Sequence, residues 1–164
     1  MTTTADATTT LCFQAIPADD LSRIRRAAVD DFGHALRVLV NHDEDGAPLR
    51  CCLREAWAGE RITLISWQPL VDAPDNVYAE IGPIFIHAED CAGYHDTGAY
   101  PEDFRHRRLV LRSYTADGDV HHLTITDGSS AETAIRELLA DPAAVVVHSR
   151  NILAGCFMFA IRRG

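Results

Sequence analysis

The stretch RLVLRSYTADGDVHHLTIT, residues 108–126, decides the fold class of this chain. Two runs of alternating apolar and polar residues, 108–115 and 120–126, flank an Asp117-Gly118 pair, and this arrangement is typical of a β-hairpin. A hairpin joins antiparallel strands, whereas parallel strands need a longer crossover. The sequence therefore predicts a mainly antiparallel sheet.

Segments on both sides of this hairpin extend the pattern. Further strands are predicted at residues 11–16, 49–57, 61–67, 77–87, 144–150 and 156–163. Apolar residues spaced three and four apart predict one helix after Pro17 and another over residues 129–140. We therefore expect an α+β fold: an antiparallel sheet of about seven strands built from hairpins, with two helices packed on it.

The length of 164 residues is sufficient for one domain with a sizeable core. Residues 1–10 are rich in Thr and Ala and offer little to bury, which predicts a disordered tail. We expect residues 11–164 to form a single globular domain.

Composition excludes several classes of function. The net charge is −9, which argues against binding to nucleic acid or to anionic membranes. All 15 basic residues are arginine, so Schiff-base and P-loop lysine chemistry are absent. No dinucleotide, nucleotide or HExxH metalloprotease motif occurs, and we expect no cofactor.

The N-terminal residues MTTTADATTT have neither the basic nor the apolar region of a signal peptide. No segment approaches the roughly 18 apolar residues of a membrane span. Five cysteines, an odd number, favour reduced thiols. We expect a cytoplasmic location; the oligomeric state is not indicated.

GPIFIHAEDC, residues 82–91, places a histidine at the end of an apolar strand and a cysteine four residues later. Ile84 and Ile86 point one way and Phe85 and His87 the other, which predicts a central strand. His87 is then a core residue with one hydrogen-bonded nitrogen, or a general base or metal ligand. A single turn would bring Cys91 close to it.

The last predicted hairpin carries further candidates. If residues 151–155 form its loop, Arg150 pairs with Cys156 and His148 with Met158, and all four share one face. A loop one residue longer or shorter breaks this grouping. With His87 and Cys91, the pair His148 and Cys156 would make a zinc-type ligand set, but no CxxC pair supports it and we assign no metal ligand.

Two other groups of residues were considered for chemistry. Strand alternation sends Cys51 to the core face and Cys52 between Arg50 and Arg54, where guanidinium groups would activate a thiol or simply form a solvated face. Arg112 alternates with apolar residues and is a candidate for clamping an anion. The alternative is that such arginines pair with the 24 acidic residues of the chain itself.

Four separated segments carry a resemblance to a known family: CCLREAWAGERITLISWQP, YAEIGPIFIHAEDCAGY, PEDFRHRRLVLRSY and HSRNILAGCF. In order and spacing they resemble the bacterial domain-of-unknown-function family 1203, over roughly residues 10–163. The resemblance implies no activity. Its segments contain Gly82, Pro83, His87, Cys91, Tyr94, Arg112, Arg150, Asn151, Gly155 and Cys156.

Two functions remain open. In the first, the protein binds an anionic small molecule or is a cofactor-free enzyme; whether it is catalytic stays undecided. The catalytic candidates are then His87, Cys91 and Cys156, and the substrate-binding candidates are Arg112, Arg150, Asn151, His148 and Tyr94. In the second, the protein is a non-catalytic module that binds a partner protein or zinc.

Overall fold

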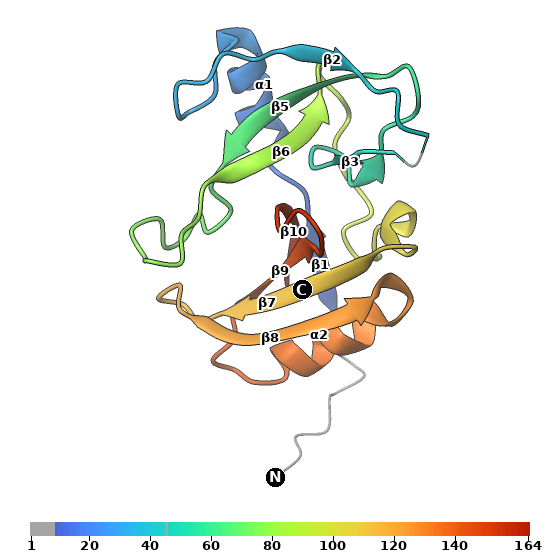
Figure 1. Cartoon of the computed structure of the whole chain (residues 1–164). Helices are drawn as coiled ribbons and strands as arrows, with labels where there is room; N and C mark the ends of the chain where they lie inside the picture. The colour runs from blue at the N-terminus through green and yellow to red at the C-terminus, as the bar shows by residue number, and fades with distance from the viewer. Residues whose placement is uncertain (1–8, 45) are drawn as a thin grey trace.

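The computed structural model describes residues 9–44 and 46–164 and shows an α+β fold with two five-stranded sheets stacked on each other (Figure 1). The predicted class is confirmed, but the single sheet is not. Ten strands form two sheets, nearly all pairs being antiparallel, and each sheet has one α-helix packed against it.

The first sheet contains the first and last strands of the chain, and we call it the terminal sheet. Its strand order is β1 (Leu11–Gln14), β10 (Phe157–Arg163), β9 (Val146–Asn151), β7 (Arg108–Tyr114) and β8 (Val120–Asp127). Every pair is antiparallel, and β7–β8 and β9–β10 are the two hairpins that the sequence predicts. Helix α2 (Ala131–Leu139) follows β8 through the short 3-10 turn η2 (Gly128–Ser130).

The second sheet is built from residues between β1 and β7, and we call it the inserted sheet. Its order is β2 (Val38–Val40), β5 (Arg61–Trp67), β6 (Gly82–His87), β3 (Pro48–Leu49) and β4 (Arg54–Glu55). It is mixed, because β3 runs parallel to β6. Helix α1 (Ala18–Ala27) packs on it, and the 3-10 turn η1 (Glu102–Phe104) precedes β7.

Two local features explain why the expected single sheet is wrong. The predicted strand 49–57 is interrupted by a turn over residues 51–53, where Leu53 has a φ of 54°. The predicted strand 77–87 begins only at Gly82, and β6 pairs with β5 and β3. The strands between β1 and β7 pair with one another, so they form a second sheet. Strand β6 is central, as predicted.

Each sheet buries its own set of apolar side chains. The terminal sheet and α2 share a core around Phe13, Phe104 and Phe159. The inserted sheet and α1 share another, in which Leu21 and Ile24 of the helix meet Ile84 and Ile86 of β6. The helices bury one face each because their apolar residues recur at three- and four-residue spacing.

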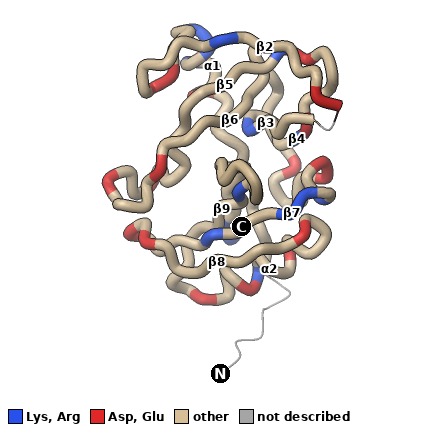
Figure 2. The backbone as a smooth tube through the Cα atoms, viewed as in Figure 1, with Lys and Arg blue, Asp and Glu red and all other residues tan. Residues whose placement is uncertain are grey.

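The face of the terminal sheet opposite to α2 carries polar and charged side chains among apolar ones. Residues two apart on a strand, and residues directly paired across strands, point to the same side. His148 pairs with Arg112 and with Ala160, so these three share the face toward the inserted sheet. Figure 2 shows basic residues along β7 and β9 in the middle of the molecule.

Other predictions concern the chain ends and the membrane. Residues 1–8 of the predicted tail lie outside the described residues. Thr9 and Thr10 are described, and their carbonyl oxygens accept hydrogen bonds from Arg136 Nε and the Gly164 amide, at 3.4 and 2.9 Å. Within the described part of the chain, no helix has the length and apolar character needed to cross a bilayer.

Gly128 gives a first testable prediction, because backbone passes very close to it. A Cβ at this position would lie 2.5 Å from the carbonyl oxygen of Arg105 and 2.6 Å from that of Phe104. Backbone atoms cannot rotate away, so we expect Gly128→Ala to lower the unfolding free energy by about 2–3 kcal/mol in urea denaturation. Gly98→Ala is the control, since nothing lies within 4 Å of its Cβ. Equal stability of the two variants would contradict the packing described here.

Candidate metal centre

Cys51 and Cys52 lie in a tight turn between β3 and β4, which places both sulfurs beside the end of β6. The amide of Leu53 donates to the carbonyl of Leu49 at 3.0 Å, closing the turn. The amide of Arg50 donates to the carbonyl of Phe85, also at 3.0 Å, which fixes the turn against β6. Because residues 51–53 are not extended, strand alternation does not separate the two thiols.

Four side chains meet at this point: Cys51, Cys52, His87 and Cys91. Their ligand atoms all lie within 4.8 Å of one another. The Sγ atoms of Cys51 and Cys52 are 3.9 Å apart, and they lie 3.4 and 3.7 Å from Nδ1 of His87. Cys91 joins them from the segment that follows β6, as its spacing from His87 suggested.

These separations match those of a tetrahedral zinc site. With zinc–sulfur bonds of about 2.3 Å and zinc–nitrogen bonds of about 2.0 Å, two sulfurs lie about 3.8 Å apart and a sulfur and a nitrogen about 3.5 Å apart. The three measured distances, 3.9, 3.4 and 3.7 Å, are within about 0.2 Å of these values. The separations among Cys51, Cys52 and His87 therefore fit a zinc-sized ion, and the ligand atom of Cys91 lies within 4.8 Å of theirs.

The other nitrogen of His87 faces a carboxylate. Nε2 lies 3.2 Å from Oε1 of Glu60, and Arg54 binds both oxygens of Glu60, at 2.8 and 2.6 Å. Nη2 of Arg54 also lies 3.0 Å from Nε2. When Nδ1 is a metal ligand, Nε2 carries the proton and donates a hydrogen bond to Glu60, and Arg54 then donates to Glu60 alone. A carboxylate in this position fixes the tautomer and orientation of a metal-binding histidine.

The metal-free cluster holds its charges in a defined pattern. Hydrogen bonds with the thiol groups of Cys51 and Cys91 raise the pKa of His87 to about 10. Hydrogen bonds from Cys51 and Cys52 hold the pKa of Cys91 far below its usual range, and the same contacts with Cys51 and Cys91 raise the pKa of Cys52. These shifts favour a protonated His87 beside a deprotonated Cys91, and metal binding would displace the remaining protons.

Apolar packing shields the cluster. Cys51 is buried and packs in the core of the inserted sheet, with Cys52 and Cys91 partly buried beside it. Helix α1 is linked to the end of β6, because Nε of Arg25 donates a hydrogen bond to the carbonyl oxygen of His87 at 3.0 Å. The four ligands thus come from two segments fixed by sheet and helix contacts.

The zinc-type set considered from the sequence is not formed. His87 and Cys91 meet, but His148 and Cys156 are not in the cluster, and their places are taken by Cys51 and Cys52. Cys156 lies instead near Arg50, whose Nη2 donates to its Sγ at 3.0 Å. Cys51 is buried in the core, as expected, and is also a member of the cluster. The expectation that Cys52 lies on an extended strand is wrong, because residue 52 lies in the turn.

The predicted face of the last hairpin is also wrong. Arg150 pairs with Phe157 and His148 with Ala160, and a β-bulge lies between Phe157 and Phe159. The extra residue of a bulge shifts the register, so Met158 enters the core of the terminal sheet. His148 and Arg150 still share a face, without Met158.

The remaining candidates have partners within the protein. Arg112 and Arg150 both bind Glu80, at 3.5 and 2.5 Å. Oδ1 of Asn151 accepts from two amides of its own turn at 2.9 Å, and the Tyr94 hydroxyl donates to the carbonyl of Ala99 at 2.6 Å. The structure therefore brings His87 and Cys91 together and places the other six candidates elsewhere.

A second group of possible ligands lies at the edge strand β8 and the end of α2. His121, His122 and Asp141 are partly or fully exposed, and Nε2 of His121 lies 2.9 Å from Oδ2 of Asp141. This group offers three ligands, none of which is a thiol and none of which is fully buried. It is a weaker site for a transition metal than the cysteine cluster.

The fold and the cluster define a two-sheet α+β protein with a Cys/His centre able to bind a metal. The chain belongs to the family described as "Protein of unknown function (DUF1203)", whose model matches residues 46–163. This confirms the resemblance, over a shorter range than expected from the sequence, and the match contains all four cluster residues. No curated protein and no solved structure matches the chain.

Proposed function

We propose that this protein binds one zinc ion through Cys51, Cys52, His87 and Cys91. The observation that carries the proposal is the set of sulfur–sulfur and sulfur–nitrogen distances, 3.9, 3.4 and 3.7 Å, which fit a tetrahedral ion. Thiolates with one imidazole favour zinc over calcium, magnesium or manganese, which prefer oxygen ligands. The function is therefore that of a zinc-binding domain.

Four protein ligands indicate a structural role for the ion. Catalytic zinc sites keep one position open for water or substrate, whereas three cysteines and a histidine fill all four. The ion would join the turn at residues 51–53 to the end of β6 and to the segment that carries Cys91. Zinc thereby stabilises the part of the inserted sheet that has the shortest strands.

Elemental analysis of untagged protein tests the proposal directly. We expect about one zinc per chain, and about none in Cys52→Ser, because loss of one thiolate removes a quarter of the ligand set. Cobalt-loaded protein should show the visible absorption of tetrahedral thiolate coordination, and Cys52→Ser should lose it.

Two control variants separate this site from other binding. Cys12→Ser removes a free cysteine outside the cluster, and His122→Asn disrupts the exposed histidine group. Both should retain the full zinc content and the cobalt spectrum. Zinc well below one per chain in the parent protein, or loss of zinc in His122→Asn alone, would show that the proposal is wrong.

Glu60 gives a prediction about affinity. Its carboxylate lies 3.2 Å from Nε2 of His87, and Arg54 holds its pKa down at about 2, so it is ionised at neutral pH. We expect Glu60→Gln to weaken zinc binding about 10- to 100-fold in a competition titration with a chromogenic chelator. Glu89→Gln removes an exposed carboxylate paired with Arg61 and should leave the affinity unchanged. Similar affinities for the parent and both variants would argue against a role for Glu60 in orienting His87.

A further inference from the structure

A cavity of about 530 Å³ lies at the face of the terminal sheet opposite to α2, apart from the zinc ligands. Its walls come from β1, β9 and β10, from the start of α1, from Trp67 at the end of β5 and Pro69 after it, and from residues 92–95. This volume is in the range of small-molecule sites. None of the four cluster residues lines the cavity.

His148 is the buried polar group of this cavity. Its side chain lines the cavity and is 2% exposed, between the rings of Tyr114 at 4.7 Å and Phe157 at 5.1 Å. Its Nδ1 is buried and has no hydrogen-bond partner among the described residues. Burial lowers the pKa of His148 to about 3, so the ring is neutral and has one N–H to donate. A buried polar group without a partner calls for a ligand or a water.

The surroundings of His148 are positively charged. Three guanidinium groups lie near enough to lower its pKa further: Arg150, Arg162 and Arg112. Two carboxylates pair with them, since Glu80 binds Arg112 and Arg150, and Asp72 binds Arg162. Both carboxylates are at least half exposed, and Nε of Arg112 is buried without a partner among the described residues. The three arginines outnumber the two carboxylates paired with them by one, but only Arg162 lines the cavity, and Asp20 lines it too.

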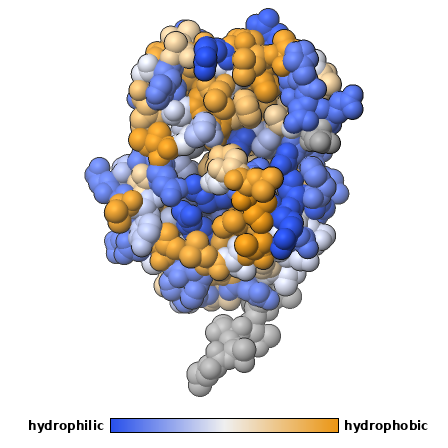
Figure 3. All heavy atoms as spheres, in the orientation of Figure 1, coloured by the Kyte–Doolittle hydropathy of each residue, from blue (hydrophilic) through white to orange (hydrophobic). Residues whose placement is uncertain are grey.

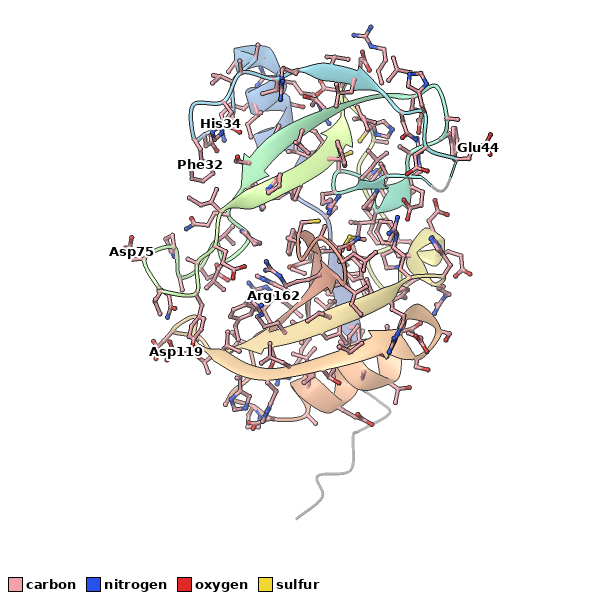
Figure 4. The ribbon with its side chains drawn as sticks, in the orientation of Figure 1. Phe32, His34, Glu44, Asp75, Asp119 and Arg162 are labelled. Carbon is pink, nitrogen blue, oxygen red and sulfur yellow. The ribbon has the colours of Figure 1, made fainter. Side chains whose placement is uncertain are left out.

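The start of α1 adds backbone N–H groups that also favour an anion. Pro17 and Ala18 line the cavity, and no side chain caps this end of the helix. The first amides of a helix lack intrahelical partners and favour an anion. Asp20 also lines the cavity, and its carboxylate lies 3.9 Å from Arg23 on the next turn. Figure 4 shows Arg162 between the two sheets, pointing toward this region.

The other walls are apolar. Ile16, Trp67, Phe157 and Ala160 supply aliphatic and aromatic surface next to the charged end. Buried apolar walls with a few convergent polar groups are typical of a site for a small amphipathic ligand. An inorganic anion would leave this surface in contact with water.

We propose that this cavity binds a small organic acid, with its carboxylate at Arg162 and His148 and its apolar part against Trp67 and Phe157. The neutral imidazole donates one hydrogen bond. Arg162 supplies the charge, and the ligand carboxylate competes for it with the exposed Asp72. This ligand site is independent of the zinc centre and does not rest on it. It also differs from the anion site expected from the sequence, in which Arg112 and Arg150 were the clamp, because neither of these arginines lines the cavity.

Calorimetric titration with three carboxylates of increasing size, hexanoate, phenylacetate and indole-3-acetate, tests the proposal. Each is compared with its neutral amide, and phenylacetate also with phenethylamine. We expect at least one acid to bind about tenfold or more tightly than its amide, and the amine to show no binding. If no acid exceeds its amide, or if the amine binds as well as phenylacetate, the proposal is wrong.

Two variants locate the binding. Arg162→Gln should weaken the best acid about tenfold, and Ala160→Leu should abolish binding by filling the cavity. Arg108→Gln is the matched control, because Arg108 also forms an ion pair on the terminal sheet, with Asp127, but does not line the cavity. An equal loss in Arg108→Gln would indicate an effect of net charge and overturn the assignment. Zinc content and melting temperature of each sample show that the fold and the metal centre are intact.

Discussion

Removal of zinc is expected to lower the melting temperature of this protein by roughly 10 °C. A ligand that binds only the folded state stabilises it by about 4 kcal/mol when its free concentration is about 1,000 times Kd. For a domain of this size, each kcal/mol corresponds to about 2–4 °C. The measurement is differential scanning calorimetry of zinc-loaded protein with and without a strong chelator such as dipicolinate.

Cys91→Ser provides the matching genetic experiment. Without chelator, this variant should already melt at the temperature of the zinc-free parent protein. Chelator should change its melting temperature little, because the site is incomplete. Cys12→Ser should respond to chelator as the parent protein does, and readdition of zinc, but not magnesium, should restore the parent. A melting temperature that chelator leaves unchanged in the zinc-loaded parent would contradict a stabilising zinc ion.

Phe159→Ala is expected to lower the unfolding free energy by about 4 kcal/mol. Phe159 is fully buried and contacts three other rings, with centroid distances of 6.1 Å to Phe13, 5.6 Å to Tyr100 and 6.0 Å to Phe104. Truncation removes the buried apolar surface and leaves a cavity between rings held by η1, β1 and β10. Urea denaturation followed by circular dichroism measures the loss.

Phe32→Ala is the control for this prediction, because Phe32 is 39% exposed and lies outside the cores of both sheets. Its effect should be within about 0.5 kcal/mol of zero. A loss below about 1 kcal/mol for Phe159→Ala would mean that the four rings do not form the packed centre of the terminal sheet.

Exposed apolar residues on an edge strand are a separate feature of the surface. Val38, Leu39 and Val40 of β2 are each about half exposed, at 50, 48 and 47%. Apolar side chains gather over β2 and β5 in the upper half of Figure 3. Sequence alternation did not indicate this strand, because all three residues are apolar and a three-residue segment has no measurable period.

Local pattern explains which parts of the fold were predictable. The hairpins β7–β8 and β9–β10 and both helices follow from alternation, turn residues and helical spacing, which act over a few residues. The division into two sheets depends on which strands pair across long stretches of chain, as when β3 joins β6 in parallel. The turn at residues 51–53 depends on a positive φ at Leu53. Residues other than glycine seldom adopt a positive φ, so the sequence does not predict this turn.

The candidate site was predictable to the same extent. The spacing of His87 and Cys91 indicated that they meet. Cys51 and Cys52 were not assigned to this cluster, because strand alternation was expected to place their thiols on opposite faces, although the adjacent pair was a signal that could have found them. Glu60 was missed, because nothing near it in sequence marks it as a partner of His87. The arginines were candidates for an external anion, but Glu80, distant in sequence, pairs with two of them.

The pairing of β1 with β10 sets an order on folding during synthesis. Leu11 is paired with Arg163, and the whole inserted sheet lies between them in the chain. At about 5–20 residues per second, β1 leaves the ribosome on the order of ten seconds before its only neighbouring strand among the described residues. The inserted sheet and the Cys/His cluster are synthesised well before that time. We therefore expect the half that contains the inserted sheet to become structured first, with β1 unpaired until the last strand completes the terminal sheet.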